Sequence, residues 1–248
     1  MTFNQLKTFI QKGLFLAIIA GIITTSMTSC KDSTETEEAS IIGKANLKLE
    51  SDLMTPEVLW SFGRLGDVQV SPDEQTILYG VSYYSKELNK SNRELFTLKL
   101  DGGSPQQITK TSGGEYNAIW SVDGSKIYFL ASAENGMQIF SMNPDGTGKS
   151  QISDIPNGVT NIKVAPNGNQ ILFTSEIKVV ENVHDMNPDL PLADAKIYDD
   201  LMYRHWDVWE DGYYSHIFIA DLVNGKVVNA KDIMEGEPFD SPLMPFGG

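Results

Sequence analysis

The sequence predicts an all-β protein built from repeated antiparallel sheets, and three observations favour this class. The chain has 21 Gly and 11 Pro among 248 residues, and such dense turn chemistry favours many short strands over long helices. A strand–turn–strand pattern recurs three times at similar spacing. Hydrophobic residues make up 41% and charged residues 21%, as in globular chains that bury a core. This composition excludes wholesale disorder and a multi-span membrane protein.

Charge and cysteine content exclude further classes. The chain carries 33 acidic and 19 basic residues, for a net charge of −14. A chain this acidic has no basic surface for phosphate backbones, so we expect no nucleic-acid partner. The one cysteine, Cys30, excludes an intramolecular disulfide and any CxxC metal or redox site. We expect no cofactor and no metal.

Residues 1–29 predict a signal peptide of the lipoprotein type. Lys7 and Lys12 precede an apolar run over residues 13–23, and small polar residues lead to Cys30. The apolar run is too short to span a bilayer comfortably. The segment Met27-Thr28-Ser29-Cys30 resembles the lipobox of bacterial lipoproteins, which implies that Cys30 becomes the lipidated N-terminus. An ordinary signal peptide with a bystander cysteine is the alternative.

Residues 30–49 predict a flexible acidic tether between the lipid and the folded domain. Residues 31–38 are polar and charged and lack any apolar period. The Cys-Lys-acidic start also looks like a signal that sends some lipoproteins to the cell surface, although a plain solvated spacer explains it equally well. We therefore expect a membrane-anchored protein of the bacterial envelope, at the periplasmic face or the cell surface.

Three similar segments, residues 67–79, 117–129 and 161–173, predict three β-hairpins. In each, a strand leads into a short turn and a second apolar strand. Pro72 and Pro166 preset φ for the turn, while Gly124 and Gly168 tolerate the positive φ at which the chain reverses. The copies are 50 and 44 residues apart, counted from Pro72 to Val122 and from Val122 to Pro166.

A second recurring unit completes each repeat with two more strands. An alternating strand and a Gly-containing turn recur at residues 94–103, 138–146 and 216–225. Polar edge strands at residues 106–109 and 149–152 follow the first two. Four strands in 44 to 50 residues are typical of a propeller blade, so we predict a partial β-propeller of about four blades over residues 50–248. A β-sandwich with coincidental spacing is the alternative.

The third repeat is interrupted over residues 178–213 by an expected short helical insertion. Aromatic and apolar residues there recur every three or four positions and predict a helix from Leu192 to about Trp209. The residues of this face are Tyr198, Met202, His205 or Trp206, and Trp209. Asp189 or its neighbours would cap the helix and Gly212 would end it. An insertion that breaks a repeat is usually a functional elaboration.

Three segments resemble the N-terminal propeller of the prolyl oligopeptidase family of serine peptidases, among its dipeptidyl and acylaminoacyl peptidase members. They are residues 53–60, the first hairpin, and the run 197–212 with its Tyr203-Arg204-His205-Trp206-Asp207 centre. The last is the most specific, because the propeller turns are shared with TolB-type periplasmic propellers. The resemblance covers about residues 50–248.

The resemblance implies a hydrolase domain that this chain does not contain. In the family, an α/β-hydrolase domain with Ser, Asp and His follows the propeller, which gates and shapes the peptide site. Residues 148–152 lack the second glycine of Gly-x-Ser-x-Gly, which the strained nucleophile elbow needs. None of the histidines, His184, His205 and His216, follows a nucleophile motif. We therefore expect the chain by itself to hydrolyse no peptide, although its parent would be a serine peptidase.

The insertion holds the candidate substrate-binding residues. In dipeptidyl peptidases of this superfamily, acids on a propeller insertion hold the ammonium of the substrate. This insertion offers several acids with aromatic walls beside them, and the resemblance does not assign the role to any one of them. The candidates are Asp199, Asp200, Arg204, Trp206, Asp207 and Trp209, with Glu210 and Asp211 as further acids. The structural alternative is that the tryptophans pack the insertion on the propeller and Arg204 pairs with Asp200. His184, Asp185 and Asp189 match no metal-ligand spacing.

Two functions remain open. The first is the propeller part of an exported serine exopeptidase, whose partners are peptide substrates and, through Cys30, the membrane. The second is a self-contained TolB-like propeller lipoprotein that binds envelope proteins.

The Cys30→Ala substitution tests the lipoprotein prediction. Without the thiol no lipid can be attached, so the variant should incorporate no labelled fatty acid and should leave the membrane fraction. Metabolic labelling followed by fractionation measures both. Continued labelling of the variant would contradict the prediction.

Overall fold

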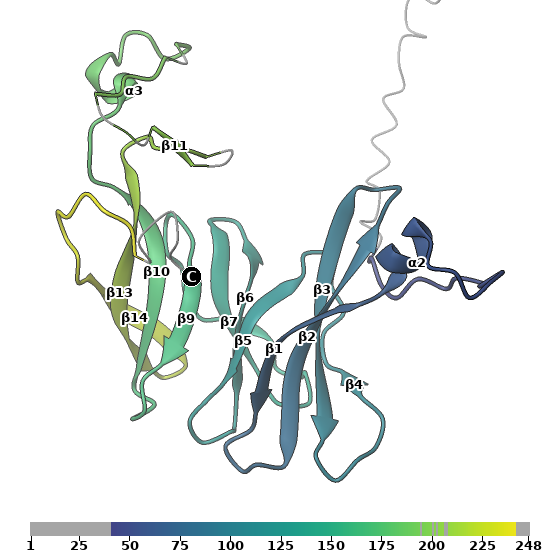
Figure 1. Ribbon diagram of the computed structural model, residues 1–248. Coiled ribbons are helices and arrows are strands. Elements are labelled where there is room, and N and C mark those ends of the chain that lie inside the picture. The colour runs from purple at the N-terminus through teal and green to yellow at the C-terminus, as the bar shows by residue number, and fades with distance from the viewer. Residues whose placement is uncertain (1–40, 194, 200, 202, 206–207, 242–248) are drawn as a thin grey trace, which may run out of the picture. The chain divides into compact units, whose positions relative to one another are not determined.

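The computed structural model describes residues 41–241, apart from residues 194, 200, 202, 206 and 207, and it is dominated by antiparallel strands (Figure 1). The predicted signal peptide and Cys30 lie outside the described residues, as does most of the tether. No helix in the described part of the chain is long and apolar enough to cross a membrane. Three four-stranded sheets form the framework, and we call them blades 1 to 3.

Blade 1 follows the short helix α2 (Pro56–Ser61), which begins at the N-cap Thr55. Its strands are β1 (Arg64–Val70), β2 (Thr76–Ser85), β3 (Lys90–Lys99) and β4 (Gln106–Gln107), in spatial order β1-β2-β3-β4. Blade 2 repeats this order with β5 (Glu115–Trp120), β6 (Ile127–Ala133), β7 (Gly136–Met142) and β8 (Ser150–Gln151). The predicted hairpins and short polar edge strands are confirmed.

Blade 3 is interrupted between its second and third strands. Its strands are β9 (Thr160–Val164), β10 (Gln170–Lys178), β13 (Tyr213–Val223) and β14 (Lys226–Asp232). Strands β10 and β13 pair without a break from Gln170–Asp221 to Lys178–Tyr213, so the insertion leaves the sheet intact. The described residues thus form three four-stranded blades rather than about four, because the insertion between β10 and β13 takes up the length of chain that a further blade would need.

The insertion is not the helix that the sequence predicted. It contains helix α3 (Val183–Met186) and a small hairpin of β11 (Arg204–His205) and β12 (Val208–Trp209). The described residues between Leu192 and Trp209 include no helical residue. The helix prediction from Leu192 to Trp209 was therefore wrong, and so were its ends: Asn182 caps α3, and Gly212 lies at the base of the insertion.

Side-chain hydrogen bonds stabilise the predicted turns between the first and second strands of blades 1 and 2. In blade 2, the Ser121 hydroxyl donates to Asp123 Oδ1 at 2.7 Å, and the Ser125 amide donates to the same oxygen at 3.0 Å. Ser71 and Asp73 repeat the contact in blade 1. Gly124 adopts φ 70° and Gly168 φ 72°, as the turn requires.

The innermost strands are joined by a ladder of bulge residues. Asp67, Asn117 and Asn161 adopt positive φ of 52°, 47° and 53°, a conformation that Asp and Asn tolerate better than other side chains. The Asn117 amide donates to Asp67 Oδ2 at 3.2 Å, and the Ile162 amide donates to Asn117 Oδ1 at 2.7 Å. One bulge therefore positions the next, 50 and 44 residues along the chain.

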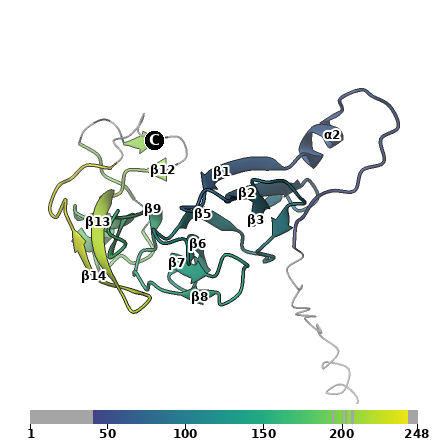
Figure 2. The same cartoon turned by 90° about the horizontal axis from the view of Figure 1, so that it is seen from below.

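Two apolar clusters lie between neighbouring blades. Leu78 and Leu95 of blade 1 pack with Trp120 and Phe129 of blade 2. Between blades 2 and 3, residues of both sheets form a second cluster. Its larger members are Leu130, Ile139, Ile162, Ile171 and Phe173. Strand β5 contacts β1, β2 and β3, and β9 contacts β5, as Figure 2 shows from a second direction.

A buried polar side chain on the third strand of each blade holds the segment that leaves the fourth strand. In blade 2, Gln138 Oε1 accepts from the Ser153 hydroxyl at 2.7 Å and from the Ile155 amide at 2.9 Å. Glu94 does the same in blade 1 with the Thr109 hydroxyl and the Thr111 amide. These side chains are at most 1% exposed, so each bond is shielded from water.

Replacing Gln138 by Leu should destabilise the protein by about 1–3 kcal/mol for each buried partner left without a hydrogen bond. The volume is nearly kept, while Ser153 and the Ile155 amide lose their acceptor. The midpoint of urea unfolding measures the change, and Gln106→Leu on the exposed edge strand is the matched control. Equal midpoints for the two variants would refute this role.

Protonation of the Asp123 carboxylate should remove part of the protein's stability in acid. Hydrogen bonds from Ser121 and then Ser125 lower the pKa of Asp123 to about 2, from 3.8. Because the folded-state pKa is depressed, its contribution is complete above about pH 4 and is lost as the pH falls towards 2. Urea midpoints at pH 5.5 and pH 2.5 should show a deficit for Asp123→Asn that shrinks at the lower pH. Asp101→Asn, in an exposed turn, controls for the loss of one charge.

Candidate functional site

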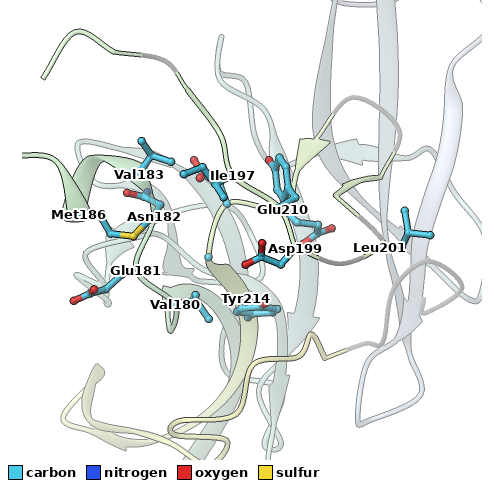
Figure 3. Close-up of a pocket in the computed structure, with 13 residues that line it drawn as sticks. Val180, Glu181, Asn182, Val183, Met186, Ile197, Asp199, Leu201, Glu210 and Tyr214 are labelled. Carbon is cyan, nitrogen blue, oxygen red and sulfur yellow. The ribbon is translucent and has the colours of Figure 1, made fainter. Parts of the chain in front are cut away.

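The insertion contains a pocket of about 350 Å³ where β10 ends and β13 begins (Figure 3). Figure 3 shows Val183 and Met186 of α3 on one side and Asp199 and Glu210 on the other. The full lining is Val180, Glu181, Asn182, Val183, Met186, Ile197, Tyr198, Asp199, Leu201, Glu210, Asp211, Gly212 and Tyr214.

Four carboxylates line this pocket, which we call the acidic pocket. They are Glu181, Asp199, Glu210 and Asp211. The ammonium of Lys196 lies 3.1 Å from Asp211 Oδ2 and balances part of their charge. Acidic side chains thus outnumber basic ones in the described lining of the pocket, which would attract a positively charged group of a ligand.

Helix α3 forms one wall of the acidic pocket through a capping box. Asn182 Oδ1 accepts from the amides of His184 and Asp185, while the Asp185 carboxylate accepts from the Asn182 amide at 2.8 Å. Lys178, the last residue of β10, forms an ion pair with Asp185. A helix of only four residues is thus fixed to the end of the blade by its first turn.

The base of the insertion is closed at Gly212. The amides of Val179 and Val180 donate to the Gly212 carbonyl at 2.9 and 3.2 Å. Gly212 has φ +76°, and a Cβ atom there would lie 2.2 Å from the Val180 carbonyl oxygen. Only glycine fits this crossing, so the two arms of the insertion meet at a fixed point.

An aromatic cluster lies on the other side of Tyr198. The rings of Tyr198, Tyr203 and Trp209 have centroids 5.8 to 6.2 Å apart, and the Arg204 guanidinium lies 5.1 Å from the centre of the Trp209 ring. Together with Lys196, these rings line a second hollow of about 560 Å³, which we call the aromatic pocket. The insertion therefore offers an acidic and an aromatic pocket next to each other.

The structure brings together some of the predicted site residues. Asp199 lines the acidic pocket with Glu210 and Asp211, and Trp209 lines the aromatic pocket with Arg204 against its ring. Asp200, Trp206 and Asp207 lie outside the described residues, and so does the expected Arg204–Asp200 pair. Trp209 is 42% exposed, so it does not serve as an anchor buried against the propeller.

Sequence reasoning missed one wall of the acidic pocket. Glu181 and Asn182 precede the stretch that was read as helical, and Tyr214 belongs to a blade strand. The Asn-x-x-Asp spacing of Asn182 and Asp185 is the capping signal that could have revealed α3. Tyr214 carries no signal of its own, because only the pairing of β10 with β13 places it beside the insertion.

The histidines serve different purposes. His184 is an exposed residue of α3, and His216 is fully buried in β13. His216 Nδ1 lies 2.8 Å from Asp232 Oδ2, and Nε2 lies 2.8 Å from the Glu237 carbonyl oxygen. These contacts place His216 in the framework, in the position that Glu94 and Gln138 hold in the other blades.

Comparison with known proteins identifies two curated relatives, although no family model matches the chain. Dipeptidyl-peptidase 5 of Porphyromonas gingivalis is 40% identical over 215 residues, which are 85% of this chain and 31% of the relative. Dipeptidyl-peptidase 5 of Porphyromonas endodontalis is 33% identical over 196 residues, which are 79% of this chain and 28% of the relative. The chain thus spans about a third of the length of the curated relatives it matches.

Solved structures support the fold. The acylaminoacyl peptidase of Pyrococcus horikoshii superposes with a TM-score of 0.54 at 16% identity, over 70% of this chain and 26% of that one. The AtxE2 isopeptidase superposes with a TM-score of 0.53 at 14% identity, over 79% and 34% of the two chains. At these identities the likeness concerns the fold alone.

Proposed function

We propose that this chain, which belongs to the prolyl oligopeptidase family through its similarity to dipeptidyl-peptidase 5, is the propeller part of an exported serine exopeptidase and shapes its peptide-binding site. The acidic pocket of the insertion is the observation that carries this proposal. The similarity to dipeptidyl-peptidase 5 confirms the family resemblance that the sequence indicated. The role in peptide binding is our inference for this chain.

The chemistry of the acidic pocket suits the amino terminus of a peptide. A free terminus is an ammonium group with three donors, and carboxylates are its natural acceptors. Glu210 and Asp211 follow each other in sequence, and Glu181 and Asp199 line the same pocket from other segments. Charge-assisted bonds from such a set would fix where the bound chain begins, as an exopeptidase requires.

The apolar part of the pocket would hold the remainder of the first residues. Val183, Met186 and Ile197 lie around the carboxylates, and Tyr214 forms the floor next to the blade. Apolar walls lower the local dielectric constant and strengthen the contact between carboxylate and ammonium. The pocket thus combines attraction for one charge with contact area for side chains.

Export and membrane anchoring complete the proposal. The lipobox-like segment before Cys30 and the acidic tether behind it support a lipoprotein of the bacterial envelope. Anchored in this way, the propeller would meet peptides outside the cytoplasm.

Binding of the dipeptide Phe-Ala should depend on Glu210 and Asp211. Changing either to its amide removes a charge-assisted bond, which should weaken binding by about tenfold or more. Isothermal titration calorimetry on the purified protein measures the affinity, and N-acetyl-Phe-Ala, which lacks the ammonium, should bind poorly. Asp189→Asn, an exposed acid of the insertion outside the pocket, is the matched control. Equal binding of the free and acetylated peptides would overturn the proposal.

A further inference from the structure

We propose that Tyr198 reads the first residue of the bound peptide: its hydroxyl donates to the carbonyl oxygen of that residue, and its ring forms one wall for the side chain. This inference rests on the proposed function. It assigns a specificity-determining role to a side chain that the sequence suggested only as part of a helix face.

Tyr198 lines both the acidic pocket and the aromatic pocket. It lines the first with Glu210 and Asp211 and the second with Tyr203 and Trp209. Among the described residues, no other side chain lines both. Tyr198 is therefore placed to contact a ligand that occupies both pockets.

The Tyr198 hydroxyl is buried and has no hydrogen-bond partner among the described residues. Buried polar atoms in folded proteins are nearly always paired, because an unpaired one loses its bonds to water without replacement. The Tyr198 ring contacts those of Tyr203 and Trp209, which restricts where its hydroxyl can lie. An unpaired donor on a residue that lines the pocket is suited to a ligand atom.

The surroundings favour a donating role for this hydroxyl. Burial raises the pKa of Tyr198, and the carboxylates of Asp211 and Glu210 add to the increase, while Lys196 opposes it. The hydroxyl therefore keeps its proton at neutral pH and can donate to a neutral acceptor.

The chemistry of a peptide supplies that acceptor at the right place. In an N-terminal residue the carbonyl oxygen is only two bonds from the α-carbon that bears the ammonium, so a terminus held by Glu210 and Asp211 brings its carbonyl close to the same wall. The side chain branches from the same carbon and can extend into the aromatic pocket. Large apolar or aromatic first residues fit this pocket best, because three rings line it.

The test compares Tyr198→Phe with the unchanged protein on two probes, the dipeptide Phe-Ala and phenethylamine. Both probes carry an amine and a phenyl ring, but only the dipeptide has the carbonyl. Titration calorimetry should show that Phe-Ala binds about 3- to 10-fold more weakly to the variant, while phenethylamine binding is unchanged. Tyr213→Phe, an exposed tyrosine outside both pockets, should affect neither.

A second comparison tests the side-chain wall. Phe-Ala should bind more tightly than Gly-Ala, and Trp209→Ala should reduce that difference. Equal loss for both amine probes, or no loss for Phe-Ala, would overturn the role of the hydroxyl even if free peptides still bind better than acetylated ones. If acetylated peptides bind equally well, or if Phe-Ala does not bind at all, the proposed function fails together with this inference.

Discussion

The buried polar side chain on the third strand of each blade is the interaction on which the rest of the fold depends. Glu94, Gln138 and His216 lie two residues before Phe96, Phe140 and Phe218, and each of these rings stacks on an aromatic residue of the second strand. The polar side chain holds the segment that leaves its own blade, and in blades 1 and 2 that segment starts the next blade. Without this bond each blade could form while its successor lost its position.

Three different polar side chains, Glu94, Gln138 and His216, occupy this position on the third strand of the three blades. Glutamate only accepts, and it takes bonds from Thr109, Thr111 and Asn92, while burial raises its pKa. Glutamine both accepts and donates, so the Gln138 side-chain amide also donates to the carbonyl oxygens of Ile155 and Asn135. His216 donates to the Glu237 carbonyl, because a carbonyl oxygen can only accept. The fold therefore requires a buried hydrogen-bonding group at this position and adapts the segment that follows to its chemistry.

The sequence predicted the features that depend on local chemistry. Proline and glycine positions gave the hairpins, since Gly124 and Gly168 have the positive φ expected of them. The helix over residues 192–209 failed because spacing alone cannot separate a helical face from a folded loop. Tyr198 and Trp209 do meet, with centroids 6.0 Å apart, but the meeting depends on the β11–β12 hairpin. Tyr214 lines the acidic pocket because it pairs with Ile177 of β10, and its neighbours in the sequence carry no sign of that contact.

The place of the insertion has a consequence for how such proteins diversify. It joins the second and third strands of blade 3, where blade 1 needs only residues 86–89 and blade 2 only residues 134–135. Strands β10 and β13 pair up to Lys178 and Tyr213, and Gly212 joins the two arms just beyond. The paired strands and the Gly212 contact therefore form one attachment point for the loop, so a change in the loop need not disturb the pairing below it. An engineer who grafts a loop from a relative onto these two strands should therefore be able to keep the register of β10 and β13.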